Sequence, residues 1–427
     1  MTETGKVNAG LRKPPHRTLI LGGGIAGLEA LLALRELAAD RTEVTLVAPD
    51  PQFTYKPVIV EEPFTYEPAE RHELEPAVRE LGADFVRGIA RAVRPDEHSI
   101  VLTEGEGYDF GATHELGYDV LLVCVGGRSH APYKHAVTFR FRSVGDPLEV
   151  EDLLARAEAH ESKTLAFVVP PGVSWALPVY ELALLTRRLA DETGRRDLHL
   201  TVLSPEESPL ALFGKPASEA VAELLHARGI DFRGDAIVRE TDEGGLLVTP
   251  GGDPIDAGAV AALPVIAGPR LAGLPFDEGG FIPIDEHARV SNVDDVYAAG
   301  DGTTFPIKQG GLGTQQADAA AEHIAAQLGA PIDPEPFHPV LRGQLITGAD
   351  PLSLRHDLTG GHGESVTSVE YLWWPPHKVA SRYLAPWLAH EEPHGLEPPS
   401  PPMDVEVALP VEWSRDPKAL DPYTPGP

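Results

Sequence analysis

The feature that most constrains this sequence is a glycine pattern close to its start. Residues 18–21 (Thr-Leu-Ile-Leu) predict a short buried strand, and Gly22, Gly24 and Gly27 follow it at the spacing G-x-G-x-x-G. Apolar residues at helical intervals from 25 to 37 predict a helix directly after the glycines. A strand, a glycine turn and a helix in this order are typical of the first half of a dinucleotide-binding βαβ unit.

Each glycine has its own physical reason in such a unit. Gly22 permits a tight turn, Gly24 lets a pyrophosphate approach the backbone, and Gly27 lets the helix pack close to the strand. The helix N-terminus then offers free N–H groups and the positive end of its dipole to the phosphates. Residues 43–47 predict the second strand, whose end usually carries a ribose-binding acid. Asp50 lies two positions late, so two interpretations stay open: it binds the ribose, or it only caps a turn with Pro51.

Composition narrows the class of protein. The chain has 35 Lys and Arg residues against 65 Asp and Glu residues, a formal net charge of −30, which argues against nucleic acid as a partner. Cys124 is the single cysteine, so neither an intrachain disulfide nor a Cys-x-x-Cys site can form, and the histidines show no metal-ligand spacing. The sequence contains no apolar run of membrane-spanning length and no secretory signal, so we expect a cytoplasmic protein.

A second buried strand is predicted over residues 118–125, ending at Gly126, with Cys124 as inert packing inside it. Strands at 165–169 and 199–203 and helices at 180–190 and 217–228 then repeat the βαβα pattern. The turn of this second unit, residues 170–175, keeps only Gly172 of three glycines. Pro170 has no N–H for a phosphate, and Trp175 stands where a small residue would let the helix pack close. Glu206 and Glu207 follow the second strand, so a ribose contact stays open.

Residues 290–328 again show a predicted strand, a turn and a helix, as at the start of the chain. A strand predicted at 296–301 ends in Gly300-Asp301, and Lys308-Gln-Gly-Gly-Leu312 precedes an alanine-rich helix predicted over 314–328. An aspartate after glycine at a strand end can accept hydrogen bonds from ribityl hydroxyls. The N-terminus of the next helix can stabilise negative charge on a flavin ring.

The C-terminal part is less regular. Segment 371–388 holds three of the five tryptophans, together with Lys378 and Arg382. These side chains either contact lipid headgroups at a membrane surface or pack on the rest of the chain or in a dimer contact, and the acidic composition favours packing. We predict that residues 1–15, and the tail 391–427 with its 10 prolines and 8 acidic residues, are extended or disordered.

The three motifs, 22–27, 118–126 and 296–301, occur in order and resemble those of flavoproteins with two dinucleotide-binding domains. The chain looks most like the branch that holds type II NADH dehydrogenases, sulfide:quinone oxidoreductases and flavocytochrome c sulfide dehydrogenases. The resemblance implies FAD as the cofactor, with Lys308 stabilising the anionic reduced flavin as the candidate catalytic residue. The candidate cofactor-binding residues are Gly22, Gly24, Ile25, Ala26, Gly27, Asp50, Lys56, Val125, Gly126, Gly300, Asp301, Lys308, Gln309 and Gly310.

The sequence also departs from this branch. Sulfide-oxidising members use a cysteine pair beside the flavin; Trp175 lies near one of those positions, and Cys124 matches neither. NADH-oxidising members need a glycine turn in the second domain, and this chain has lost two of the three glycines. The leading hypothesis is a sulfide:quinone oxidoreductase-like enzyme without the cysteine pair that passes electrons from a reduced donor through FAD to a quinone or another small acceptor.

Two alternatives remain: an NAD(P)H-dependent reductase of the type II NADH dehydrogenase kind, and a flavin-binding redox sensor or scaffold. Peripheral contact with the inner face of a membrane through 371–388 and a homodimer are further open points. The predicted fold is α/β, with two Rossmann-like domains and a small C-terminal region. The FAD domain covers 16–145 and 269–335, the NAD-like domain 146–268, and the C-terminal aromatic region 336–390.

Overall fold

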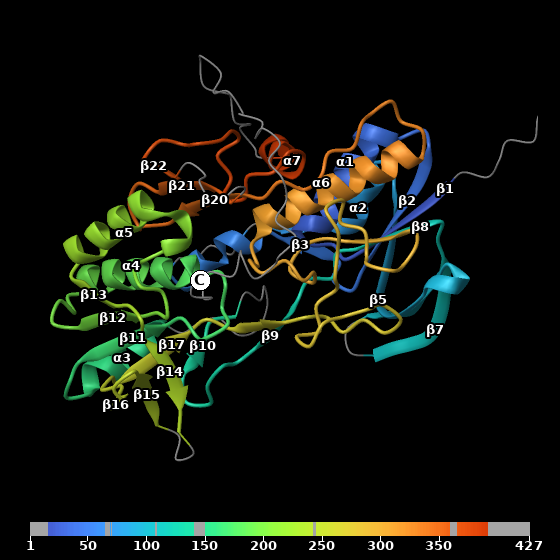
Figure 1. Cartoon of the computed structure of the whole chain (residues 1–427). Coiled ribbons are helices and arrows are strands. Elements are labelled where there is room, and N and C mark those ends of the chain that lie inside the picture. Colours follow the sequence, from blue (N-terminus) through green and yellow to red (C-terminus); the bar gives the residue numbers. More distant parts are fainter. Residues whose placement is uncertain are drawn as a thin grey trace, which may run out of the picture.

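The computed structural model describes residues 16–64, 69, 71–106, 109–140, 150–241, 245–358 and 365–391 (Figure 1). The stretch 1–15 and all but the first residue of the tail 391–427, both predicted to be disordered, lie outside the described residues.

A seven-stranded sheet forms the first half of the molecule, in the order β19-β8-β1-β2-β5-β6-β7. Its first five members pair in parallel, and β5, β6 and β7 form an antiparallel extension. Helices α1 (Ile25–Ala38) and α6 (Gly310–Gln327) lie side by side on one face of this sheet (Figure 1). The strands are β1 (His16–Leu21), β2 (Thr42–Ala48), β5 (Asp84–Arg94), β6 (Ser99–Glu106), β7 (Asp109–Gly117), β8 (Val120–Val123) and β19 (Val296–Ala298).

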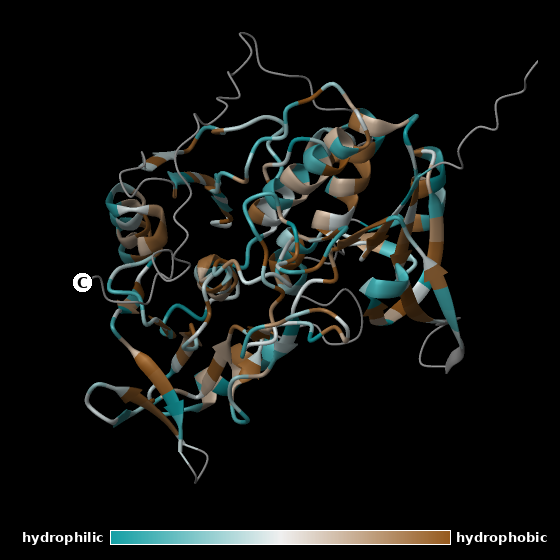
Figure 2. Cartoon of the chain, turned by 45° about the vertical axis from the view of Figure 1, so that its right-hand side comes forward, coloured by the Kyte–Doolittle hydropathy of each residue, from teal (hydrophilic) through white to brown (hydrophobic). Residues whose placement is uncertain are grey.

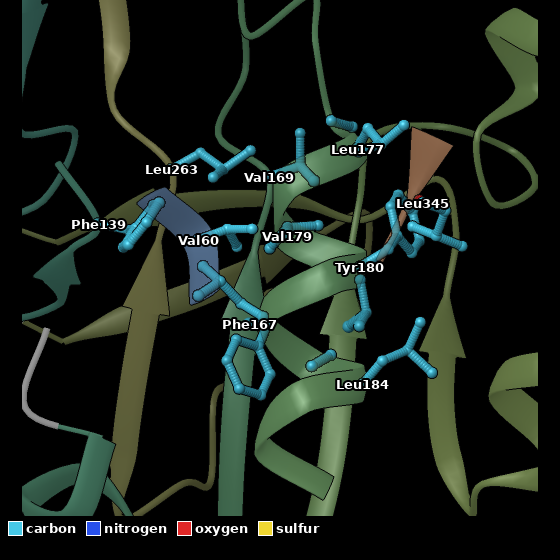
Figure 3. Close-up of a cluster of buried hydrophobic side chains, with 14 of the residues drawn as sticks. Val60, Phe139, Phe167, Val169, Leu177, Val179, Tyr180, Leu184, Leu263 and Leu345 are labelled. Carbon is cyan, nitrogen blue, oxygen red and sulfur yellow. The ribbon is translucent and has the colours of Figure 1, made fainter. Parts of the chain in front are cut away.

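A second sheet of five parallel strands has the order β10-β17-β11-β12-β13. Figure 3 shows helix α4 packed on this sheet, with Val60 of a 3₁₀ segment inserted beside Val179. A three-stranded antiparallel unit, β14-β15-β16, is attached to it. The elements are β10 (Val137–Thr138), α3 (Val150–Ala159), β11 (Thr164–Val168), α4 (Leu177–Glu192), β12 (His199–Leu203), η3 (Ala211–Phe213), α5 (Lys215–Ala227), β13 (Ile230–Arg233), β14 (Ile237–Glu240), β15 (Leu246–Thr249), β16 (Asp253–Pro254) and β17 (Ala259–Ala262).

The C-terminal region contains a third sheet that the sequence pattern did not predict. Strands β20 (Val340–Leu345), β21 (Leu352–Asp357) and β22 (Ser365–Ser368) are antiparallel, and helix α7 (Leu384–Glu391) follows them. Leu341, Leu345 and Leu354 join the same hydrophobic core as Phe213 and Leu177 of the second unit. This sheet therefore covers the start of α4 and the η3 turn.

Short elements complete the chain, and one predicted boundary is corrected. Residues 71–73 pair with residues 52–54, so the helix of this segment begins only at Leu74. Helix α6 begins at Gly310 rather than at 314, because the side chain of Gln309 caps it by accepting the Leu312 N–H at 2.8 Å. The remaining elements are β3 (Gln52–Thr54), η1 (Lys56–Phe64), β4 (Arg71–Glu73), α2 (Leu74–Glu80), η2 (Pro95–Glu97), β9 (Arg128–His130) and β18 (Val265–Ala267).

Hydrophobic side chains explain why the two parallel sheets form. All four residues of β8 and of β17 are buried, as expected for parallel strands covered on both faces. Figure 2 shows brown, hydrophobic residues along the strands, whereas teal residues interrupt the helices. The predicted α/β class with two Rossmann-like units is confirmed.

Candidate cofactor site

A cavity of about 470 Å³ opens at the carboxyl ends of β1, β2, β8 and β19. Strand β1 pairs with β2 on one side and with β8 on the other, so the chain crosses over at this edge of the sheet. A crossover of this kind is where open parallel sheets bind their ligands.

The three glycines of the first turn differ in their surroundings. Gly22 has φ +113°, and a Cβ there would lie 2.2 Å from the Cys124 carbonyl oxygen. A Cβ at Gly27 would lie 1.8 Å from the Gly22 carbonyl oxygen, so only glycine lets α1 pack this close. A Cβ at Gly24 would meet no atom within 4 Å, because this position faces the open cavity. Gly24 is also the N-cap of α1 and supplies no side-chain cap to the helix.

The opposite wall comes from segments far away in sequence. Gly126, with φ +67°, and Gly300, with φ +85°, line the cavity next to the ends of β8 and β19. A Cβ at Gly313 would lie 3.1 Å from the Gly300 Cα, so α6 points its N-terminal turn at the cavity from close range. Two helix N-termini, of α1 and α6, thus border one cavity, a favourable arrangement for an anionic ligand.

Charged side chains are few at this site. Asp50, Lys56 and Asp301 line the cavity, as does Arg128, which follows the glycine pair after β8. Burial raises the pKa of Asp301, and the nearby Lys308 and Lys56 partly offset this shift. The Asp301 carboxylate makes no hydrogen bond to another residue in the described part of the chain, so its acceptor oxygens are available to a ligand such as ribityl hydroxyls.

Twelve of the fourteen predicted cofactor-binding residues line the cavity, and Gly27 and Lys308 do not. Gly27 lies behind the turn, as its packing role requires. The Lys308 ammonium donates to the carbonyl oxygens of Thr303, at 2.6 Å, and Phe305, at 2.7 Å. It also lies 3.8 Å from the centre of the Phe281 ring. Burial lowers the Lys308 pKa to about 8, although Asp301 and Asp277 oppose that shift. In this arrangement Lys308 holds the loop beneath the cavity.

Arg128 and residues 88–90 of β5 also line the cavity and were not predicted. Arg128 could have been predicted from the sequence, because it directly follows Gly126-Gly127 at the end of a predicted strand. The position of β5 beside the cavity could not, because it depends on how two distant strands pair.

At the corresponding edge of the second sheet, Trp175 and Glu206 make contacts within the chain. Trp175 is half-buried, with its ring centre 5.7 Å from that of Phe213. Glu206, 8% exposed, accepts hydrogen bonds from Tyr180, at 2.6 Å, and Ser204, at 3.0 Å. Burial raises the Glu206 pKa to about 6, and these hydrogen bonds partly oppose the shift. The Glu206 carboxylate, for which a ribose contact was left open, is therefore already engaged in hydrogen bonds with Tyr180 and Ser204.

The first turn of α4 is also covered. A Cβ at Gly343 of β20 would lie 3.0 Å from the Leu177 side chain, and the Ile346 N–H donates to Glu181 at 2.9 Å. The first turn of α4 is therefore buried, and the turn before it lacks two of the three glycines of a nucleotide site.

A buried ion pair that the sequence did not predict joins α4 to the C-terminal region. The Lys378 ammonium lies 2.6 Å from the Glu181 carboxylate, with side-chain exposures of 9% and 0%. It also donates to the Pro57 carbonyl oxygen at 2.8 Å. Burial raises the Glu181 pKa to about 7, and Lys378 lowers it in opposition. The interpretation that Lys378 faces lipid headgroups is therefore wrong, because its ammonium is engaged inside the protein.

The aromatic segment packs largely on the rest of the chain. Trp373 is 6% exposed, and Trp387 lies against His72, with ring centres 5.1 Å apart, beside the core of the first unit. Tyr371 is 41% exposed. Among the described residues, no helix is long and apolar enough to cross a membrane, and no group of three or more His, Cys, Asp or Glu residues could hold a metal ion.

Comparisons with known proteins agree with this architecture. The sequence profile of a family described as pyridine nucleotide-disulphide oxidoreductase matches residues 16–323. A type II NADH:quinone oxidoreductase, NdhA of Mycobacterium tuberculosis, is 25% identical over 379 residues, covering 78% of this chain and 77% of its own.

Among solved structures, the sulfide:quinone oxidoreductase of Aquifex aeolicus is similar with a TM-score of 0.71 and 17% identity, over 83% of this chain and 87% of its own. NDH2 of Plasmodium falciparum, solved with NADH, is similar with a TM-score of 0.54 and 16% identity, over 67% and 64% of the two chains. At these identities the structures support the fold alone.

Proposed function

Because the chain belongs to the pyridine nucleotide-disulphide oxidoreductase family, we propose that it is an FAD-dependent oxidoreductase that takes electrons from a donor other than NAD(P)H. The acceptor would be a quinone or another small molecule. The single observation that carries this proposal is the contrast between the two sheet edges. The first has an open glycine cradle, whereas Trp175 and the engaged Glu206 occupy the second.

The residues of the first edge suit the parts of FAD. The uncapped start of α1 at Gly24 would receive the pyrophosphate, and Asp301 would accept hydrogen bonds from the ribityl hydroxyls. Asp50 lines the cavity near the end of β2 and would meet the adenosine ribose. The bound FAD would supply the electron-carrying chemistry, and the protein would supply position and charge.

Lys308 enters this proposal in a changed role. Its ammonium holds two carbonyl groups of the loop 303–305, so we assign it a positioning role under the flavin end of the cavity. Its positive charge still adds to the potential in which the reduced flavin would form.

The cysteine pair of sulfide-oxidising enzymes has no counterpart here. Cys124 is the only cysteine of the 427 residues, and burial raises its pKa to about 12. A thiol of this kind is a poor nucleophile. A donor would therefore have to reduce the flavin directly.

The relatives' names support one competing function, an NAD(P)H-dependent quinone reductase. Anaerobic stopped-flow mixing separates the two. We expect dithionite to bleach the flavin absorbance of the purified protein, whereas NADH and NADPH leave it unchanged on the time scale of turnover. Fast bleaching by either nucleotide would contradict our proposal and support the NAD(P)H-dependent quinone reductase instead. Purified protein that retains no FAD after reconstitution would contradict both.

A further inference from the structure

The face of the C-terminal sheet that lies opposite its hydrophobic core carries polar side chains, and three of them, those of Arg342, Gln344 and Ser353, make no hydrogen bond to another described residue. In β20, Leu341, Gly343 and Leu345 are buried toward the second unit, so Arg342 and Gln344 point to the other face. The register pairs Arg342 with Arg355 and Gln344 with Ser353, which places all four on that face.

Arg342 is half-buried, yet within the described ranges its guanidinium makes no hydrogen bond and no ion pair. Its cross-strand neighbour is Arg355, a like charge, and Asp357 provides an attractive charge diagonally across the strands. Burial, reinforced by Arg355, lowers the Arg342 pKa to about 10. A buried guanidinium without a hydrogen-bond acceptor is energetically unfavourable. None of the 65 acidic residues of this chain forms an ion pair with Arg342 in the described ranges.

Ser353 gives a second, independent observation. Its side chain is 1% exposed, and its hydroxyl is buried without a hydrogen-bond partner. The Gln344 side chain opposite it likewise makes no hydrogen bond among the described residues. Guanidinium, amide and hydroxyl donors thus gather on one sheet face. Buried polar groups in proteins are normally paired, so such a group of unsatisfied donors calls for a ligand.

The face lies next to the candidate cofactor site. The Gln309 amide donates to the Arg342 carbonyl oxygen at 3.1 Å, and Gln309 and Gly310 line the cavity. Gln315 of α6 holds Val340 through hydrogen bonds of 2.9 Å to its N–H and to its carbonyl oxygen. The start of β20 is therefore fixed against the N-terminal turns of α6.

We propose that this face of β20 and β21 binds an oxyanion on a small-molecule ligand, with Arg342 as the bidentate donor and Ser353 and Gln344 as flanking donors. Carboxylates and tetrahedral sulfur or phosphorus oxyanions share the required chemistry of two adjacent acceptor oxygens. In terms of the proposed function, on which only this step rests, the ligand would be a negatively charged electron donor or acceptor held beside the flavin end of the cavity.

The test is a calorimetric titration of the FAD-loaded full-length protein with sulfate, phosphate, thiosulfate, acetate and benzoate. Chloride keeps the ionic strength constant. We expect saturable binding of at least one probe, and the comparison of tetrahedral anions with carboxylates identifies the preferred class. Arg342→Met should weaken that binding by about 10- to 100-fold. Arg79→Met is the matched control, because Arg79 lies in an exposed pair with Glu75 and should leave binding unchanged.

Two further variants keep the test decisive if Arg342→Met folds poorly. Arg342→Lys retains the charge but loses the planar fork, so an intermediate loss is expected, and Ser353→Ala should weaken binding a few-fold. The absence of saturable binding by every probe, or equal binding by wild type and the Arg342 variants, would overturn the proposal. FAD content and reduction by dithionite, measured on the same samples, report on the proposed function independently.

Discussion

At the scale of single residues, the glycines of the first turn are needed for different physical reasons. Gly22 and Gly27 are required by contacts inside the protein, since a Cβ at either would clash with a backbone oxygen. A Cβ at Gly24 would meet no protein atom within 4 Å, so only a ligand in the cavity would require glycine there. The difference allows ligand binding to be separated from folding with one substitution.

We predict that Gly24→Val abolishes FAD retention while the protein still folds. The φ of −91° at Gly24 suits any residue, and the new side chain would project into open space that the pyrophosphate needs. Absorbance of the purified protein at the flavin band measures retention, and circular dichroism measures folding. Gly245→Val, at an exposed glycine outside the site, is the control and should keep FAD. If Gly24→Val protein still retained FAD, the assignment of the glycine turn 22–27 as the FAD-binding site would be wrong.

At the scale of elements, the turn between β11 and α4 and the end of β12 show how a nucleotide-binding topology can be filled from within. Glu206 stands where an acid would bind ribose, but it instead accepts from Tyr180 of α4 and from Ser204. The carboxylate thereby becomes part of the packing between helix and strand, and its titration becomes linked to folding.

We predict that Glu206 makes stability fall as pH rises from 4.5 to about 6. Burial raises the folded-state pKa of Glu206 from 4.5 to about 6, so the folded protein holds this proton more tightly than the unfolded chain. The difference in unfolding free energy between wild type and Glu206→Gln should therefore decline by about 2 kcal/mol across this range and stay constant above it. Urea unfolding at several pH values measures it. Glu207→Gln, at the exposed neighbour, is the matched control variant.

At the scale of the whole molecule, the C-terminal region ties the two units together. Lys378 bonds to Pro57 of the first segment and to Glu181 of α4, and the Val379 N–H donates to the Tyr55 hydroxyl at 2.7 Å. Glu29 of α1, itself buried, accepts the N–H groups of residues 382–384 at the start of α7. Removal of either anchor would leave a buried charge or backbone group unpaired.

We predict that Lys378→Met lowers the unfolding free energy by about 3–5 kcal/mol near pH 8, because it leaves the buried Glu181 carboxylate without its counter-charge. The exposed pair of Lys163 and Asp197 offers a matched control, and Lys163→Met should change the unfolding free energy far less than Lys378→Met does. Adding Glu181→Gln to Lys378→Met should restore part of the loss. Equal losses for the two lysine variants in chemical denaturation would rule out the buried pair as an anchor.

The sequence by itself determined the parts that depend on local spacing. The strands, the glycine turn and the helices of both parallel units follow from hydrophobic periods and glycine positions. The family resemblance, which rests on the same motifs, implied fourteen cofactor-binding residues, and twelve of them line the cavity. The lost glycines at 170–175 likewise indicated that the second edge would differ from the first.

Only the tertiary structure decided what depends on segments far apart in the chain. Glu181 and Lys378 are 197 residues apart, so no local pattern could show that this lysine is buried rather than exposed to lipid. The Lys308 ammonium turned to carbonyl groups of its own loop, and the donors of β20 and β21 met only when those strands paired. Burial and hydrogen-bond partners are properties of the assembled fold, and they decide which charged side chains remain available for chemistry.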